Sequence, residues 1–271
     1  TAFDLTSLEK IKTLDPICYK IASCDIDNYP LLNEVRKLNK PVIFSTGMSN
    51  QNEIIKCHNF LSSGGVFTLP LHCVSAYPAP LEHLNLRFIQ HLSKILGSNV
   101  GYSSHDLGIN ASLTAVTLGA SLIEKHITHD KNAIGPDHKA SLEPDEFCKL
   151  ANGIREVWTS LQGSGRTRKI TQIEQLNKHN LGKGLYATSD IGRNESLISS
   201  NFIVRSPGGG VSPMILSNIH QYVATQPIKK GNLLFQTSIK NKTKINKALE
   251  KDNKLINNQR YLWGVPVRYR D

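Results

Sequence analysis

The sequence predicts an α/β fold, a (β/α)8 TIM barrel of which only part is present, followed by a small β-rich domain. Short β-branched and apolar runs alternate with longer amphipathic stretches about every 25–30 residues, the pattern of a parallel sheet with helical crossovers. Reactive side chains follow every predicted strand, and a barrel builds its active site at this edge from all its strands. A doubly wound sheet places ligands there at one or two junctions only, so the barrel is favoured.

The first part of the chain holds the predicted barrel elements. Asn50 and Pro144 suit the first turns of two helices. Five strands cannot close an eight-stranded barrel, and the chain begins without Met, so we expect strands 4–8 here and three further βα units before residue 1. The predicted strands are 17–22, 41–45, 66–72, 100–103 and 121–127, with helices near 28–38, 50–62, 84–96, 108–119 and 144–161.

The chain divides into four predicted segments. Residues 1–161 form the barrel part, and residues 162–180 are a basic linker containing Gly and Ser. Residues 181–240 change to short strands and turns, which indicates the small β-rich domain. Residues 241–271 are a basic tail, whose apolar run near its end is strand-like and would open a further element.

Composition narrows the class of protein. The chain has no apolar run long enough to cross a bilayer and no secretory signal, so we expect a cytoplasmic protein without membrane contact. The five cysteines show no CxxC spacing and are expected to be buried reduced thiols. Most of the net charge of +10 lies in 162–180 and 241–271, with no nucleic-acid motif, so nucleic-acid binding is not expected.

Two histidines stand at the ends of consecutive predicted strands. His105 and His126 follow apolar runs, so their side chains can converge on one ion. Two imidazoles with open positions favour Mn²⁺, Fe²⁺, Co²⁺ or Zn²⁺ over Mg²⁺, and leave room for water and substrate. The alternative is that both histidines only form hydrogen bonds at the barrel mouth. A third strand-end histidine, His72, is a candidate to bind substrate or to orient its neighbours.

A lysine within an apolar strand is the second chemical feature. Lys20 must be paired or functional in such a setting. With Ser23, Ser45, Thr46 and nearby backbone N–H groups, it forms a candidate phosphate cradle. A Schiff-base role for Lys20 is the rival, although the metal-like histidines argue against it.

Six motifs together resemble those of the sialic acid synthase family. They are YKIAS (19–23), STGM (45–48), LHCVSAYPAP (71–80), GYSSHDLG (101–108), TLGASLIEKHIT (117–128) and GPDHKASLEPDE (135–146). The later run RSPGGGVSP (205–213) resembles that family's antifreeze-like (SAF) domain. The resemblance implies a transferase that condenses phosphoenolpyruvate with N-acetylmannosamine or a related hexosamine, forming a nonulosonic acid and phosphate. It also implies a domain-swapped homodimer.

The resemblance assigns roles to individual residues. His105 and His126 match the metal ligands, with Mn²⁺ as the expected ion and Mg²⁺ or Co²⁺ as alternatives. Glu124 matches a catalytic acid, and Arg205 matches the arginine lent to the partner's site. The matched substrate-binding positions are Lys20, Ser23, Ser45 and Ser103 for phosphate and carboxylate, and Tyr77, Asp137 and Asp25 for the sugar.

The chain departs from the family pattern in ways that leave alternatives open. Ser104 replaces an Asp beside His105, and Asp25 replaces a longer Glu. The first three barrel strands are expected to bring further catalytic groups, so this stretch alone is expected to be inactive or very weak. A non-catalytic sugar-binding paralogue and a metal-dependent aldolase that uses pyruvate are therefore the competing hypotheses.

Overall fold

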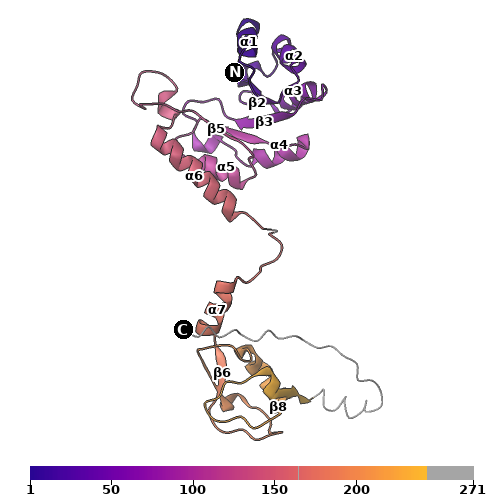
Figure 1. The fold of residues 1–271 in the computed structure, drawn as a ribbon, viewed down its shortest axis with the longest axis vertical. Coiled ribbons are helices and arrows are strands. Elements are labelled where there is room, and N and C mark those ends of the chain that lie inside the picture. The colour runs from indigo at the N-terminus through magenta and orange to yellow at the C-terminus, as the bar shows by residue number, and fades with distance from the viewer. Residues whose placement is uncertain (164, 243–271) are drawn as a thin grey trace, which may run out of the picture. The chain divides into compact units, whose positions relative to one another are not determined.

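The computed structural model describes residues 1–163 and 165–242 (Figure 1). The chain forms two compact units, Thr1–Ser164 and Gly165–Asp271, and each is described by itself. The strand-like run predicted near the end of the chain lies outside the described residues.

The first unit is built on one parallel sheet whose five strands follow the order of the chain. Each strand pairs with the next, with Lys20 beside Ile43 and Ser103 beside Glu124. The predicted α/β class and all five predicted strands are confirmed. The strands are β1 (Tyr19–Ile21), β2 (Val42–Ser45), β3 (Thr68–Cys73), β4 (Gly101–Ser104) and β5 (Ile123–Lys125).

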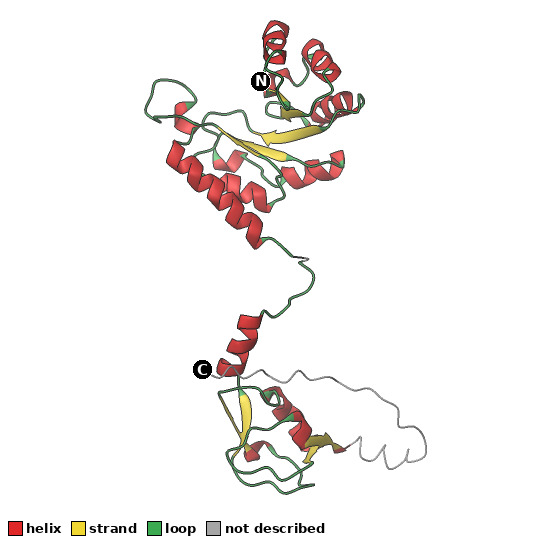
Figure 2. Ribbon diagram, in the orientation of Figure 1, coloured by secondary structure: helices red, strands yellow, loops and turns green. Residues whose placement is uncertain are grey.

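Helices line one side of this curved sheet (Figure 2). Asn50 caps α3 in a reciprocal capping box with Glu53, and Pro144 is the first residue of α6, as the sequence predicts. A helix that the sequence analysis missed, α1, begins at Asp4, whose carboxylate accepts a hydrogen bond from the Ser7 N–H at 2.7 Å. The helices are α1 (Leu5–Lys12), α2 (Tyr29–Lys37), α3 (Gln51–Ser62), α4 (Phe88–Leu96), α5 (Asn110–Thr117) and α6 (Pro144–Ser160).

The alternation of side chains along each strand separates the core from the site. Ile21, Phe44 and Tyr102 are buried in one apolar cluster with residues of the surrounding helices. Their neighbours in sequence, such as Lys20 and Ser45, point to the opposite face, because successive strand residues alternate. Polar strand residues such as Lys20, Ser45, Ser103 and Glu124 therefore lie on the inner face of the curve.

The second unit begins with a helix rather than with an extended linker. The linker predicted over 162–180 is wrong from Gln172 onward, where α7 (Gln172–Leu181) begins. Thr171 and Glu174 form a capping box at its start. This Thr-x-x-Glu pattern indicates a helix, whereas the Gly and basic residues before it indicate a linker.

Two antiparallel strand pairs follow α7. β6 (Gly184–Ala187) pairs with β7 (Phe202–Arg205), and β8 (Tyr222–Ala224) pairs with β9 (Ile239–Asn241). Short 3₁₀ turns connect them around a small core that contains Leu185, Leu197 and Leu234. The β-rich character predicted for 181–240 is thus present.

None of the helices in the described part of the chain combines the length and the apolar character that a bilayer crossing requires.

Candidate active site

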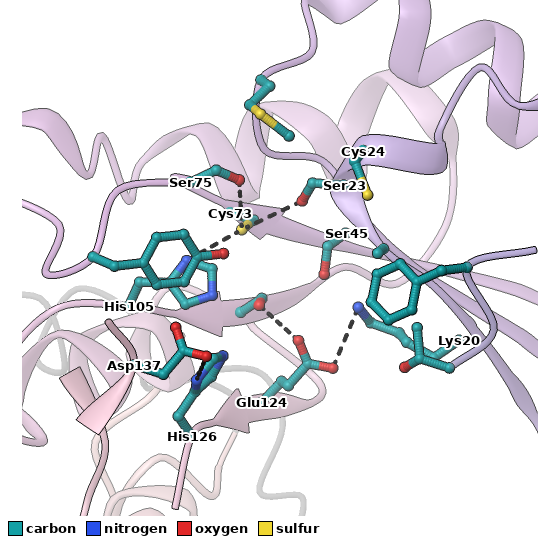
Figure 3. A pocket seen from close by; sticks show the side chains of 16 residues that line it. Lys20, Ser23, Cys24, Ser45, Cys73, Ser75, His105, Glu124, His126 and Asp137 are labelled. Atoms are coloured by element: carbon teal, nitrogen blue, oxygen red, sulfur yellow. Dashed lines mark hydrogen bonds and ion pairs between the residues drawn. The ribbon is translucent and has the colours of Figure 1, made fainter. Parts of the chain in front are cut away.

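The carboxyl ends of the five parallel strands surround one cavity of about 530 Å³, shown in Figure 3. This edge of a parallel sheet is where barrel enzymes build their sites. Nine of the eleven predicted site residues line the cavity: Lys20, Ser23, Ser45, Tyr77, Ser103, His105, Glu124, His126 and Asp137.

The two histidines face each other across the cavity edge. Their ring centroids are 5.2 Å apart and the rings are nearly perpendicular. His105 follows the last residue of β4 and His126 follows the last residue of β5, and these strands are neighbours in the sheet. The convergence predicted from their spacing is therefore present.

His105 is held by its backbone and by its ring. The Nδ1–H donates to the carbonyl oxygen of Val74 at 2.9 Å, which leaves Nε2 with its lone pair. The His105 carbonyl accepts a hydrogen bond from the Ala79 N–H at 2.9 Å, and the Tyr77 ring lies 4.2 Å from the imidazole. Burial lowers the pKa of His105, but hydrogen bonds with Cys73 and Val74 outweigh it and raise the pKa overall.

His126 is less enclosed. Its carbonyl accepts a hydrogen bond from the Leu142 N–H at 2.9 Å, and its Nδ1 lies 4.0 Å from a carboxylate oxygen of Asp137. Burial lowers the pKa of His126, and the neighbouring His105 lowers it further. The neutral imidazole, which is the form that binds metals, is therefore favoured at this position.

The two imidazoles of His105 and His126 fit a metal cation that is held by few protein ligands. Within residues 1–163 and 165–242, no three or more His, Cys, Asp or Glu side chains are arranged as a metal site. A metal-binding histidine typically donates its other ring N–H to a carbonyl or carboxylate, as His105 does to Val74. Two imidazoles with further positions open are what a Lewis-acid site requires.

Glu124 links the strands on both sides of the cavity. One of its oxygens accepts a hydrogen bond from Ser103 Oγ at 2.7 Å, and the other lies 3.4 Å from Lys20 Nζ. Lys20 is therefore paired, as its apolar strand requires. The ion pair spans the cavity floor from β1 to β5 (Figure 3).

Hydroxyl groups gather beside Lys20. Ser45 Oγ is buried and has no hydrogen-bond partner among the described residues, although it lines the cavity. A buried hydroxyl without a partner is rare, and here it points to a ligand. Ser23 Oγ accepts a hydrogen bond from the Gly47 N–H at 3.1 Å. Lys20, Ser23 and Ser45 together offer the donors that an anionic group needs.

Two predicted residues do not line the cavity. Asp25 is buried below it and accepts a hydrogen bond from Asn28 Nδ2 at 2.8 Å, so its carboxylate serves the turn before α2. Arg205 lies in the second unit, where its guanidinium stacks on Tyr186 at 4.1 Å. The predicted role of Arg205 in a partner's site stays a prediction.

His72, the third strand-end histidine, points away from the cavity. Its Nε2–H donates to the Leu84 carbonyl at 2.7 Å, within the core.

Cys73 is the functional-site residue that the sequence analysis missed. Its thiol lies 3.7 Å from Ser23 Oγ and 3.8 Å from His105 Nδ1, inside the cavity. Its position at the end of β3 is a sufficient signal, because polar groups at strand ends reach the cavity. Burial raises the pKa of Cys73, and its contacts with His105, Ser23 and Ser103 together outweigh burial and lower the pKa overall. The prediction that every cysteine is buried is also wrong, because Cys24 and Cys148 are exposed.

Residues 1–166 match the family model of the NeuB family. The chain belongs to this family. The resemblance to sialic acid synthases seen in the motifs is therefore confirmed for the first unit. The match ends before α7, so it does not test the antifreeze-like assignment of the second unit.

Several proteins similar to this chain have the names of nonulosonic acid synthases. The chain is 41% identical over 238 residues to N,N'-diacetyllegionaminic acid synthase of Campylobacter jejuni, covering 86% of this chain and 70% of that protein. Pseudaminic acid synthase of the same species is 34% identical over 236 residues, covering 86% and 68%. The solved structure of N-acetylneuraminic acid synthetase from Leptospira borgpetersenii, in complex with citrate, has a TM-score of 0.61 and 33% identity, covering 65% of this chain and 62% of that one. The chain thus spans about two thirds of these relatives.

Proposed function

We propose that this chain belongs to a nonulosonic acid synthase that condenses phosphoenolpyruvate with N-acetylmannosamine or a related hexosamine. The observation that carries the proposal is the division of one cavity into two chemical halves. Lys20, Ser23 and Ser45 form an anion-binding half, and the histidine pair with Tyr77 and Asp137 forms a half suited to a polyhydroxylated aldehyde. The names of the related synthases support the same product class.

His105 and His126 would hold a divalent cation, for which Mn²⁺ is the first candidate and Co²⁺ or Mg²⁺ are alternatives. A bound cation supplies polarisation of the sugar aldehyde, which makes its carbon more electrophilic. The fixed Nδ1–H of His105 keeps its Nε2 available for this purpose.

The remaining residues bind and orient the two substrates. Lys20 and the Ser23 and Ser45 hydroxyls hold the phosphate and carboxylate of phosphoenolpyruvate, so that its C3 faces the aldehyde. C3 bonds to the aldehyde carbon, and the electron pair of the broken C=O π bond moves to the aldehyde oxygen, which takes up a proton to become a hydroxyl. Water adds at the electron-deficient C2, and Glu124, oriented by Ser103 and Lys20, is placed to accept its first proton. The C2 hydroxyl then loses its remaining proton as phosphate leaves with cleavage of the C–O bond, which gives the ketone.

The sugar half of the cavity uses Asp137 and Tyr77. The Asp137 carboxylate lies beside His126 and accepts hydrogen bonds from sugar hydroxyls. The Tyr77 ring covers His105 and excludes water from one side of the aldehyde.

The second unit is proposed to be an antifreeze-like domain that serves the partner subunit of a domain-swapped homodimer. Arg205 at the end of β7 would recognise the acylamino group, because its planar guanidinium offers several donors at once. A cytoplasmic location belongs to the same proposal, since phosphoenolpyruvate is a metabolite of the cell interior.

The test uses the full-length protein with Mn²⁺, phosphoenolpyruvate and a panel of N-acetylated hexosamines. Release of phosphate in equal amount to a nonulosonic acid is expected, with no product from pyruvate. Product from pyruvate without phosphate release would establish the aldolase instead. Binding of Mn²⁺ and hexosamine without any turnover would overturn the synthase in favour of a non-catalytic sugar-binding protein.

A further inference from the structure

A buried polar cluster lies behind the histidines, on the face of β4 and β5 that points away from the cavity. It consists of Tyr102, Ser104, Asp106 and Lys125, whose exposed fractions are 0%, 1%, 0% and 8%. Ser104 pairs with Lys125 across the two strands. Because strand residues alternate between faces, Ser103 and Glu124 line the cavity while Ser104 and Lys125 do not.

The hydrogen bonds of the cluster converge on Asp106. Its Oδ1 accepts from Tyr102 Oη at 2.7 Å and from Ser104 Oγ at 2.7 Å. Lys125 Nζ donates to Ser104 Oγ at 2.9 Å and also to the backbone carbonyl of Asp106. The Ser104 hydroxyl therefore bridges the ammonium and the carboxylate, which makes the cluster a buried pair of opposite charges.

The positions of these residues in the chain give the cluster its significance. Ser104 and Asp106 are the residues on either side of His105, and Lys125 is the residue directly before His126. Lys125 contacts both flanks of His105, so the two histidine-bearing segments are joined by hydrogen bonds behind the cavity. Separating the Lys125 ammonium from its oxygen partners would leave a buried charge unpaired, which costs free energy. The two segments are therefore held in this arrangement.

We propose that Ser104, Asp106 and Lys125 are positioning residues that hold His105 and His126 in the relative orientation needed to act on one ligand. The inference deepens the proposed function, because it concerns the same histidines, but the orientation itself does not depend on which reaction they serve. Supporting residues of this kind typically change metal affinity by about 10–100-fold when they are altered.

The side chains of Ser104 and Asp106 lie within one hydrogen bond of each other, since Ser104 Oγ donates to Asp106 Oδ1 at 2.7 Å. Exchanging the two residues therefore keeps a carboxylate and a hydroxyl in the cluster and should preserve its function. The double variant Ser104→Asp/Asp106→Ser keeps the charge and the composition, whereas Asp106→Ser alone removes the carboxylate.

The experiment measures the orientation of the histidines without relying on activity. The full-length protein and its Asp106→Ser, Lys125→Met and Ser104→Asp/Asp106→Ser variants are treated with diethylpyrocarbonate, and modification of each histidine is followed by mass spectrometry. We expect His105 to react faster in the two single variants and at the original rate in the double variant. The affinity for Mn²⁺, measured by titration below the melting temperature, is expected to fall by about tenfold or more in the single variants and to be restored in the double variant.

Two controls separate positioning from general destabilisation. Leu31→Ala removes a fully buried side chain of α2 from the apolar core and should lower stability without altering His105. His91, which lies on α4 and bonds to Gln51, should react equally in every variant.

The outcomes are distinct. Unchanged reactivity of His105 in Asp106→Ser and Lys125→Met, with only a lower melting temperature, would overturn the proposal. If these variants do not fold, Ser104→Ala keeps both charges and removes only their bridge, and unchanged His105 reactivity in it would overturn the proposal equally. If the unaltered protein binds no Mn²⁺ but the reactivity changes as expected, the metal assignment fails and the positioning role stands.

Discussion

The two histidines of the candidate site differ in how firmly the fold fixes them. His105 is buried and is bound through its ring to Val74, through its carbonyl to Ala79, and through its contact with Tyr77. His126 has a third of its side chain exposed, and the Asp137 carboxylate lies 4.0 Å from its Nδ1, beyond hydrogen-bond distance. His105 is therefore the fixed partner of the pair, and His126 is the one whose ring can adjust to a ligand.

Replacing either histidine tests the metal assignment. His105→Ala or His126→Ala is expected to reduce metal-dependent turnover by about two orders of magnitude or more, because the cation loses one of two protein ligands. Turnover is measured by phosphate release at saturating Mn²⁺, with circular dichroism to verify the fold. His91→Ala is the matched control, since His91 lies outside the cavity. Undiminished activity in either variant would remove that residue from the metal site.

Gly47 is a second residue on which the site depends. A Cβ at this position would lie 2.1 Å from Ser75 Oγ and 2.9 Å from Ser23 Oγ, so both hydroxyls would have to move. Gly47→Ala is therefore expected to raise the KM for phosphoenolpyruvate more than the KM for the hexosamine. Steady-state kinetics with each substrate varied in turn measures this. Gly192→Ala serves as a comparison, because a Cβ there would meet only the flexible carboxylate of Glu195 at 3.3 Å. Equal KM changes for both substrates would contradict the anion-binding role of this corner.

Residues that end a strand could be predicted from the sequence, because the strand fixes the edge of the sheet at which they lie. His105, His126 and Ser45 follow or end their strands and reach the cavity as expected. Ser23 and Asp25 share one 3₁₀ turn, and of the two only Ser23 lines the cavity, because Asn28 donates to the Asp25 carboxylate. The distinction depends on side-chain hydrogen bonds, which spacing alone does not reveal.

At the scale of elements, β3 carries a histidine that links stability to pH. Burial lowers the pKa of His72, whose neutral ring donates a hydrogen bond to the Leu84 carbonyl. In the unfolded chain its pKa is near the ordinary value of about 6.5. Below that pH the unfolded state binds a proton that the folded state resists, so the free energy of unfolding falls as the pH decreases through and below this value.

The measurement is the difference between two stability curves. Urea unfolding of the full-length protein and of His72→Gln is followed from pH 8 to pH 5. The fall in the free energy of unfolding below pH 6.5 is expected to be less steep in His72→Gln, because one titrating group is gone. His83→Gln, an exposed histidine of the loop before α4, should keep the original slope. Parallel curves for His72→Gln and the unaltered protein would refute the assignment.

Elements with strong periodicity could be predicted, and helices marked mainly by their caps could not. The five strands could be predicted because β-branched residues and strand-end polar groups coincide. Helices α1 and α7 were missed by the sequence analysis because each is marked by a capping side chain (Asp4 and Thr171) rather than by a long apolar face. The tertiary arrangement of such helices depends on packing, which a single sequence does not display.

At the scale of the whole molecule, the two units raise the question of which chain completes each site. The family match covers the first unit only, and Arg205 belongs to the second. Arg205 stacks on Tyr186 and donates to the Gly231 carbonyl at 3.4 Å. These contacts fix the orientation of the guanidinium within its own unit. A guanidinium that is already oriented loses little conformational freedom when it binds a ligand. Arg205→Ala is accordingly expected to raise the KM for the hexosamine more than that for phosphoenolpyruvate.

Complementation between two impaired variants decides whether Arg205 acts on its own chain or on a partner. In a domain-swapped dimer, a His105→Ala chain lends an intact Arg205 to the site of an Arg205→Ala chain, which still holds His105. One working site per mixed dimer is then expected, so co-expression should restore activity at a hexosamine concentration well below the raised KM of Arg205→Ala, where each variant alone is nearly inactive. If Arg205 served its own chain, every site in the mixed dimer would lack one group. Co-purification with two different affinity tags isolates the mixed dimer, and absence of activity in it would exclude the swapped arrangement.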